Sequence, residues 1–298
     1  MQPAFLGADS DSVGFGAFNL DGELQIPGVI HHDFIDFAPG SIERLAAAVT
    51  VAASDRRVTL ISWEPHVYGQ PAGAEEVLAE VAAGGWDDYL SEAAGELRDT
   101  DQTVLLRFAH EMDQETSQLH PWAGQEPALY IEAWRHVHRI FEEEGAKNVE
   151  WVWTPVGRVV DDRFVSDQWY PGDRWTDMVG FTAYSFWQWE ESNAEHAVRS
   201  PADLILPRYR ALAKHDKPVI IPEFGVDHHP TRQQDEVPWL KEFVDLVQTQ
   251  MPDLVAVPYF FAPHDASGGQ PDWRLEPAQQ EAFHAQLADA SRFELRVP

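Results

Sequence analysis

Two glutamates, Glu111 and Glu223, stand where a carboxylate could do chemistry, because each follows an apolar run typical of a buried strand. In 104–111, three aliphatic residues are followed by an arginine, a histidine and the glutamate. In 218–225, the glutamate stands between a proline and a Phe-Gly pair. A charge at the end of a core strand is costly unless it is used there. Both positions are therefore candidate catalytic sites.

A pair of carboxyl groups across a cleft is the smallest apparatus that hydrolyses a glycosidic bond. One protonates the leaving oxygen, while the other attacks the anomeric carbon or activates a water molecule. A lone glutamate is more often a solvated charge or an ion-pair partner, which is what we expect of Glu64 in its Glu-Pro turn. For the pair Glu111 and Glu223, catalysis is the favoured interpretation.

The elements that would position this pair alternate regularly along the chain. Strands are predicted at 4–7, 29–37, 58–63, 103–109, 148–154, 178–184, 218–221 and 254–261, and helices at 42–53, 87–98, 127–144, 201–215, 237–250 and 277–290. The stretches 8–28 and 66–86 are expected to be loops. Eight such units predict a single (β/α)₈ barrel domain over 1–298. In that ring the fourth and seventh strands are opposite, so the two glutamates would face each other across its mouth.

The composition excludes several classes of protein. The 298 residues include 50 acidic and 21 basic residues, for a net charge of −29, and only four lysines: Lys147, Lys214, Lys217 and Lys241. Such a surface repels phosphate backbones and anionic membranes, so we expect neither a nucleic-acid nor a membrane partner. So much negative charge with so little lysine suggests adaptation to high salt.

Cysteine and targeting signals give little information about location. The chain contains no cysteine, so a disulfide framework is excluded and the redox compartment cannot be inferred. No apolar run has the length of a membrane span, and no signal peptide is visible at the start of the sequence. We expect a monomer and leave the localisation open.

The stretch Arg107-Phe108-Ala109-His110-Glu111-Met112-Asp113 resembles the Arg-x-x-His-Glu-Met-Asn motif of glycoside hydrolase family 26, the β-mannanase family. That family also includes β-1,3-xylanases and mixed-linkage β-glucanases. Further similar stretches follow in family order at 61–65 (ISWEP), 85–89 (GWDDY), 133–137 (AWRHV), 149–153 (VEWVW), 170–173 (YPGD) and 217–225 (KPVIIPEFG). Each motif is weak alone, but together they are fairly specific.

The resemblance implies a retaining double displacement without a cofactor or metal. Glu111 matches the general acid/base, Glu223 the nucleophile, and His110 a residue that contacts sugar near the cleavage point. Tyr184 matches a tyrosine that donates a hydrogen bond to the nucleophile, and Arg107 is a further candidate for this. Glu111 must be protonated and Glu223 ionised, and retention requires their carboxyl groups about 5–5.5 Å apart. The implied substrate is β-mannan first, then mixed-linkage β-glucan or β-xylan, and the resemblance favours an extracellular location.

The sequence departs from the family pattern around the expected sugar subsites. Asp113 stands where asparagine is usual, and Gln114-Glu115-Thr116 replaces the usual Gly-x-Trp, so we expect Trp122 to supply the aromatic platform. Thr182 stands where the family often has aspartate, and the eighth strand ends without the tryptophan common there. These departures affect the substrate more than the reaction. Since flat aromatic rings stack on sugars, the other sugar-binding candidates are Trp63, Trp169, Trp187 and Phe261.

Two alternatives come from other classes of protein. The groups His31-His32-Asp33, Asp227-His228-His229 and His264-Asp265 lie near predicted strand ends, which would suit a metal-dependent hydrolase. Metal hydrolases on this fold often carry His-x-His on the first strand, which is missing here, so we expect no metal. The second alternative is a carbohydrate-binding barrel with weakened catalysis. The presence of both Glu111 and Glu223 argues against it.

Overall fold

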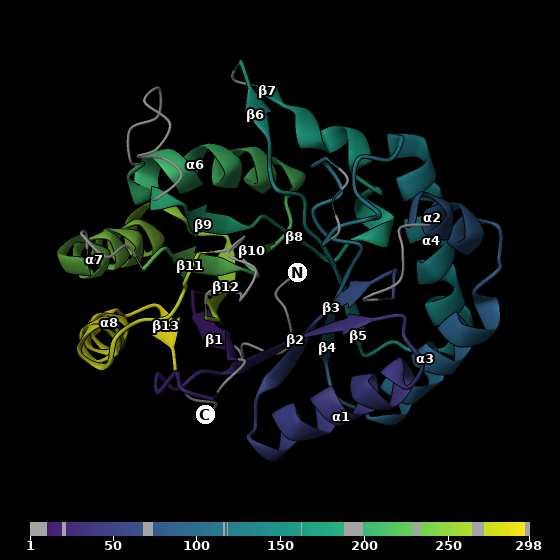
Figure 1. The fold of residues 1–298 in the computed structure, drawn as a ribbon, viewed down its shortest axis with the longest axis horizontal. Coiled ribbons are helices and arrows are strands. Elements are labelled where there is room, and N and C mark those ends of the chain that lie inside the picture. Colours follow the sequence, from purple (N-terminus) through teal and green to yellow (C-terminus); the bar gives the residue numbers. More distant parts are fainter. Residues whose placement is uncertain are drawn as a thin grey trace. The chain divides into compact units, whose positions relative to one another are not determined.

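Parallel strands alternate with helices along the chain in a computed structural model (Figure 1). The structure describes residues 11–19, 22–67, 74–115, 117, 119–161, 163–187, 199–228, 233–263 and 271–295. Among them, strands β1, β2, β3, β4, β5, β8, β10 and β12 follow one another in chain order through the sheet, and β1 also pairs with β12. This is the strand order of the predicted (β/α)₈ barrel. The chain separates into two compact units, residues 31–181 and residues 1–30 with 182–298.

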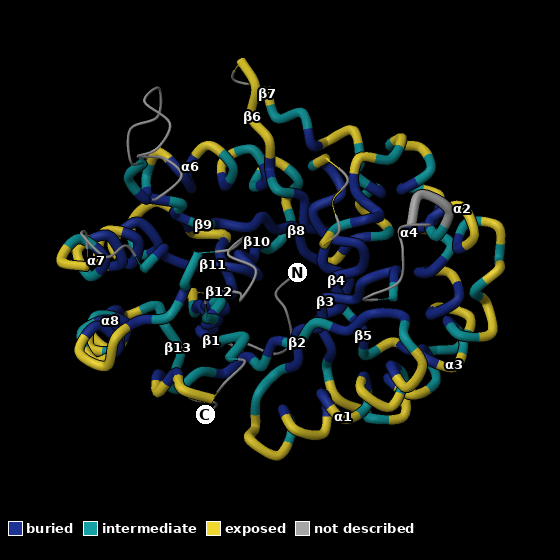
Figure 2. Tube along the Cα trace, in the orientation of Figure 1, coloured by how far each residue is buried: buried dark blue, intermediate teal, exposed yellow. Residues whose placement is uncertain are grey.

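The unit 31–181 contains the strands on which the Glu111 motif lies. Its strands are β2 (Ile30–Asp36, whose first residue belongs to the other unit), β3 (Val58–Glu64), β4 (Val104–Phe108), β5 (Val149–Trp153) and β8 (Met178–Gly180). β3 and β4 are parallel from Thr59 opposite Val104 to Trp63 opposite Phe108. All five residues of β4 are buried, and most residues of β3 and β5 are buried as well (Figure 2). Strands covered on both faces in this way carry continuous apolar runs.

Four helices belong to the same unit: α1 (Ser41–Ser54), α2 (Ala74–Ala82), α3 (Asp87–Asp99) and α4 (Pro127–Glu144). Helix α4 has the predicted bounds because its ends are well marked. Proline occupies its first turn, where the missing N–H costs nothing, and Gly145 ends it with φ of 77°. Its buried face is Tyr130, Ala133, Trp134, Val137, His138, Ile140 and Phe141. Between β5 and β8 lie a short hairpin, β6 (Val159–Val160) and β7 (Arg163–Phe164), and two 3₁₀ turns (Val165–Trp169 and Asp173–Trp175).

The second unit contains β1 (Val13–Asn19), β9 (Ala183–Ser185), β10 (Val219–Ile220), β11 (Phe224–Val226), β12 (Leu254–Phe261) and β13 (Phe293–Glu294). β1 and β12 are parallel over six residue pairs, from Gly14 opposite Ala256 to Asn19 opposite Phe261. Helices α6 (Pro201–Leu212), α7 (Gln233–Gln250) and α8 (Pro277–Asp289) pack in series, α6 on α7 and α7 on α8 (Figure 1). A 3₁₀ turn, Ala213–His215, extends α6.

Two loop predictions were wrong. The first described strand is β1, inside the stretch predicted as loop, whereas 4–7 lies outside the described residues. Glycines at 14 and 16 hide this strand, because glycine weakens strands in general. Here Gly16 allows close packing, since a Cβ atom at that position would lie within 2.5 Å of Ile30 Cβ. Helix α2 replaces part of the second predicted loop, with Leu78 and Val81 fully buried.

The strand predicted at 178–184 is divided into β8 and β9. The strand predicted at 218–221 shortens to β10, and β11 begins at Phe224, four residues after β10 ends. None of the helices in the described ranges is long and apolar enough to cross a membrane.

Candidate active site

Glu111 lies three residues beyond the end of β4, in a turn with unusual backbone angles. Ala109 has φ of 44° and Glu111 φ of 55°, both in the left-handed region that side chains disfavour. Backbone hydrogen bonds hold this turn: the Ala109 N–H donates to the Trp63 carbonyl (3.0 Å) and the Glu111 N–H to the Thr154 carbonyl (2.7 Å). The ends of β3 and β5 therefore fix the backbone from which the glutamate projects.

The Glu111 side chain is largely buried, with 9% of the residue's surface exposed. Gln114 Nε2 donates a hydrogen bond of 2.6 Å to Glu111 Oε2, and His120 Nε2 lies 3.4 Å from the same oxygen. Sequence reasoning missed both neighbours as site residues. The available signal was that Gln114 and His120 belong to the stretch where the family pattern breaks down.

His110 lies in a cluster of rings beside Glu111. Its ring centroid is 5.2 Å from that of His120 and 5.4 Å from that of Trp122, whose Nε1 donates to the His110 carbonyl (2.7 Å). Glu64, expected as a loop charge, is instead buried, with Oε1 3.9 Å from His110 Nε2. Burial, and secondarily the Arg107 charge, lower the pKa of His110 well below its usual value. A neutral imidazole can offer one donor and one acceptor to a ligand.

Arg107 lies on β4 with none of its surface exposed. Its Nη1 donates to Ser62 Oγ (2.9 Å), which is also 2.8 Å from His32 Nε2. Burial, and then the Arg107 charge, lower the pKa of His32 well below its usual value. The strands β2, β3 and β4 thus share one buried polar network next to the Glu111 turn.

Asp113, predicted to bind substrate, is 2% exposed, and its carboxylate binds the loop that follows β5 in the same unit. Its carboxylate accepts hydrogen bonds from the Val156 N–H (2.7 Å), the Gly157 N–H (3.3 Å) and Ser166 Oγ (2.5 Å). These contacts fix the chain after β5.

Glu223 lies between β10 and β11 and is 7% exposed. Tyr184 Oη donates a hydrogen bond of 2.5 Å to Glu223 Oε2, and the Ala183 N–H donates to the Glu223 carbonyl (2.9 Å). The Tyr184 ring packs on Trp273, with centroids 4.5 Å apart. Gly225 allows this packing, since a Cβ there would lie 3.1 Å from the indole and 3.2 Å from the phenol ring. Strand β12 ends without the tryptophan that is common there, and Trp273 lies in the segment that follows it. This tryptophan was not predicted as a site residue.

The predicted aromatic residues are distributed unevenly. The Trp122 ring packs against His110 and His120, which lie beside Glu111. Trp63 is fully buried, and its ring packs against those of Phe37, Tyr89 and Phe108. Half-buried Trp169 donates to the Gln125 carbonyl (3.2 Å), and Trp187 is buried. Phe261 lines a cavity of about 530 Å³ with Gln25, His228, Asp272, Arg274 and Glu276 among its other lining residues.

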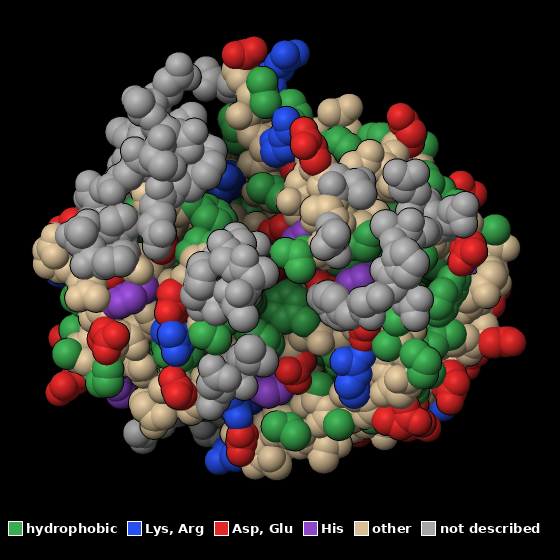
Figure 3. Space-filling view, viewed as in Figure 1, with side chains coloured by type: hydrophobic (Ala, Val, Ile, Leu, Met, Phe, Trp, Pro, Cys, Tyr) green, Lys and Arg blue, Asp and Glu red, His purple; other side chains and the backbone are tan. Residues whose placement is uncertain are grey.

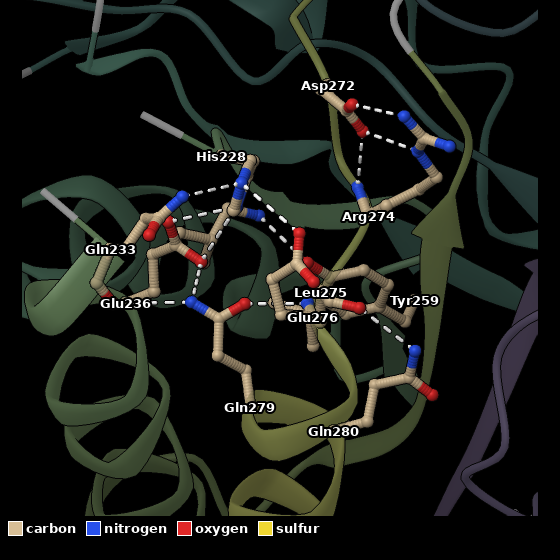
Figure 4. A network of polar contacts seen from close by, with 11 residues as sticks. His228, Gln233, Glu236, Tyr259, Asp272, Arg274, Leu275, Glu276, Gln279 and Gln280 are labelled. Carbon is tan, nitrogen blue, oxygen red and sulfur yellow. Dashed lines mark hydrogen bonds and ion pairs between the residues drawn. The ribbon is translucent and has the colours of Figure 1, made fainter. Parts of the chain in front are cut away.

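A buried network supports the chain segment that follows β11 (Figure 4). Glu236 of α7 has a fully buried side chain, with Oε1 3.3 Å from His228 Nδ1. Gln279 of α8 donates to Glu236 Oε2 (2.6 Å), and the His228 N–H donates to the Asp272 carbonyl (2.7 Å). Burial raises the pKa of Glu236 to about 7, although the nearby His228 opposes this shift.

The groups considered for a metal do not assemble into a ligand set within the part of the chain that the structure describes. No group of three or more His, Cys, Asp or Glu side chains there is arranged to hold a metal ion. His31 instead pairs with Asp33 at 2.8 Å, and His228 pairs with Glu236. His229, His264 and Asp265 lie outside the described residues.

Comparisons with known proteins relate part of this chain, including Glu111, to one family of glycoside hydrolases. The model of glycosyl hydrolase family 26 matches residues 80–204. Endoglucanase H of Acetivibrio thermocellus is 26% identical over 230 residues, which is 75% of this chain and 23% of that protein. Mannan endo-1,4-beta-mannosidase A and B of Caldalkalibacillus mannanilyticus is 33% identical over 112 residues, 33% of this chain and 20% of that protein. The chain thus spans less than a quarter of the length of these curated relatives.

Solved structures extend the likeness over nearly the whole chain. A GH26 beta-mannanase from Bacteroides ovatus is 17% identical with a TM-score of 0.63, covering 96% of this chain and 88% of that one. A modular endo-beta-1,4-mannanase from Cellulomonas fimi is 18% identical with a TM-score of 0.70, covering 98% and 73%. At these identities the structures show a shared fold. Taken together, the comparisons show that the chain is similar to glycosyl hydrolase family 26 in sequence over residues 80–204 and shares the fold of its solved members over nearly the whole chain.

Proposed function

We propose that this protein is a retaining endo-β-glycosidase that cleaves a β-linked polysaccharide, with Glu111 as acid/base and Glu223 as nucleophile. The observation that carries the proposal is the matched setting of the two glutamates. Each lies just beyond or between strands of a (β/α)₈ barrel, is more than nine-tenths buried, and accepts a hydrogen bond from a neighbouring side chain. Carboxyl groups at the C-terminal ends of barrel strands are typically catalytic.

In the proposed reaction, an ionised Glu223 oxygen attacks the anomeric carbon while Glu111 gives its proton to the leaving glycosidic oxygen. The bond to that oxygen breaks and a glycosyl-enzyme ester forms. Glu111 then takes a proton from water, which attacks the same carbon and releases Glu223 as a carboxylate. The hydrogen bond from Tyr184 Oη to Glu223 Oε2 orients the carboxylate for this attack.

The substrate that we propose is β-1,4-mannan, because one curated relative and several structures of the same fold carry mannanase names. β-Glucan is the second candidate, because the relative aligned over the larger part of the chain is named an endoglucanase. The departures at 113–116 and the packing of Trp273 near the nucleophile are the features most relevant to this choice. Reducing-sugar release from mannan, mixed-linkage β-glucan and β-xylan under identical conditions decides between the candidates.

The mechanism is tested with Glu223→Ala and Glu111→Ala, assayed both on the preferred polysaccharide and, for azide rescue, on the matching aryl β-glycoside. We expect each variant to lose about a thousandfold or more of the activity on the polysaccharide, because each lacks a group that takes part directly in breaking or forming a bond. Azide should rescue Glu223→Ala by direct displacement, giving an α-glycosyl azide. In Glu111→Ala, azide should instead attack the glycosyl-enzyme and give a β-glycosyl azide.

The configuration of each azide product is read by NMR. Glu143→Ala, an exposed change on α4, is the control and should keep wild-type activity. Near-native activity of Glu223→Ala, or the same azide anomer from both variants, would contradict the assigned roles.

A further inference from the structure

Glu111 Oε2 has two nitrogen neighbours that come from the stretch where the chain departs from its family. Gln114 Nε2 donates to it at 2.6 Å, and His120 Nε2 lies 3.4 Å away. We propose that Gln114 and His120 are positioning residues that keep Oε2 as a hydrogen-bond acceptor and leave Oε1 to carry the transferable proton. The inference rests on the proposed function, in which Glu111 is the acid/base.

The Gln114 contact assigns the two oxygens. An amide nitrogen is a donor only, so the oxygen that it meets must present a lone pair. When Glu111 is protonated, the proton is therefore placed on Oε1. The two contacts also restrict rotation of the Glu111 carboxyl group. Gln114 is only three residues further along the chain, so its side chain can contact Glu111 in few orientations.

The position of His120 is fixed by its surroundings. Its ring meets those of His110 and Trp122 edge to face at 5.2 and 5.3 Å, and its backbone N–H donates to Ser117 Oγ (3.0 Å). The titratable groups that interact with His120 in the unit 31–181 are Glu111, His110 and His66, and Glu64 lies 3.9 Å from His110. The positive charge of His120 contributes to lowering the pKa of both His66 and His110.

The charge of His120 has opposite effects on the two steps. A protonated His120 favours the ionised Glu111, which helps Glu111 take a proton from water but hinders its giving one to the leaving oxygen. A neutral His120 reverses this balance. The charge state of His120, 3.4 Å from Glu111 Oε2, therefore acts in opposite directions on the acid step and the base step.

The test compares two substrates that differ in their need for an acid. A polysaccharide leaves as a poor alkoxide that needs a proton, whereas a 2,4-dinitrophenolate leaves without one. We expect Gln114→Ala and His120→Ala to lower kcat/KM on the polysaccharide about tenfold, a fraction of the full worth of general acid catalysis. On the dinitrophenyl β-glycoside, kcat/KM should stay within about twofold. His120→Gln keeps an N–H donor and should recover most of the loss.

The pH dependence of kcat/KM distinguishes a positioning role from a purely structural one, because a structural role would leave it unchanged. Donors to a carboxylate stabilise its ionised form, so their removal should shift the alkaline limb of kcat/KM on the polysaccharide to higher pH. Gln102→Ala and His136→Ala, which replace side chains on the outside of the same unit, are the matched controls and should leave the profile unchanged. Equal losses on both substrates with an unmoved alkaline limb would overturn the proposal.

Failure of the proposed function is recognised separately. It would appear as a wild-type protein inactive on every polysaccharide and on the aryl glycosides. The contact itself is then tested by NMR titration of the His120 ring in Glu111→Gln. Loss of the neighbouring carboxylate should move that titration to lower pH, and an unchanged midpoint would overturn the coupling even in an inactive protein.

Discussion

At the scale of single residues, the turn after β4 shows how function can conflict with stability. Ala109 and Glu111 both occupy the left-handed region, where a non-glycine residue costs about 1–3 kcal/mol. The backbone bonds to Trp63 and Thr154 hold them there. At position 111 the proposed catalytic role requires a glutamate, so glycine cannot replace it to relieve the backbone strain. At position 109 no such reason applies.

Ala109→Gly should therefore raise the free energy of unfolding by up to about 1 kcal/mol, because glycine adopts this backbone without strain. Urea unfolding monitored by tryptophan fluorescence measures the change. The matched control is Ala53→Gly in helix α1, which should lower stability by about 1 kcal/mol. A loss of stability in both variants would show that the backbone at position 109 is not under strain.

Tyr184→Phe removes the hydroxyl that donates to Glu223. A hydrogen bond to a charged group contributes about 1.5–3 kcal/mol, so we expect kcat to fall roughly ten- to hundredfold with a small change in KM. Tyr89→Phe is the control: its hydroxyl bonds Ser41 on helix α1, so stability should change and kcat should not. An unchanged kcat in Tyr184→Phe would remove the tyrosine from the reaction.

At the scale of elements, boundaries could be predicted wherever the sequence marks them chemically. The first-turn proline and the terminal glycine fix α4, and β12 has its predicted bounds because 254–261 is an unbroken apolar run. β1 was missed because Gly16 serves a packing contact with Ile30 that only the folded chain reveals. The positions of Glu111 and Glu223 just after buried strands could be predicted from the apolar runs that precede them. The contacts of Gln114, His120 and Trp273 depend on how loops fold back, which no periodicity encodes.

The network that joins α7, α8 and the segment after β11 gives a pH-dependent prediction. Folding raises the pKa of Glu236 from 4.5 to about 7, so the folded protein holds this proton more tightly than the unfolded chain. Stability from this group is full at low pH and is lost as the pH rises from about 4.5 to 7. At about 1.4 kcal/mol per pH unit, the loss is of the order of 3 kcal/mol.

Glu236→Gln does not titrate, so its unfolding free energy relative to wild type should rise by that amount between pH 4.5 and 7. Denaturant unfolding at a series of pH values measures the difference. Glu242→Gln, exposed on the same helix, should give a flat difference curve. A flat curve for Glu236→Gln as well would mean that the carboxyl group is already solvated in the folded protein.

At the scale of the whole molecule, the large negative charge is the feature that should make stability depend on salt. Acidic side chains are spread over the face shown in Figure 3, and the net charge of −29 repels itself in the folded state. Salt screens this repulsion, with a Debye length of about 3 Å at 1 M. Tm should therefore rise by several degrees from dilute buffer to about 1 M NaCl, more than in sucrose of equal osmolality. A Tm independent of NaCl would contradict adaptation to high salt.

The placement of the few lysines has a practical consequence for attaching the protein to a surface. Lys147 precedes β5, and Lys214 and Lys217 precede β10, so they lie at the strand ends opposite to those near Glu111 and Glu223. Lys241 is exposed on α7, where it pairs with Asp245. Coupling through the ε-amines of Lys147, Lys214 and Lys217 should therefore attach each unit by the strand ends remote from its glutamate, which leaves the glutamate-bearing strand ends accessible to a large polysaccharide.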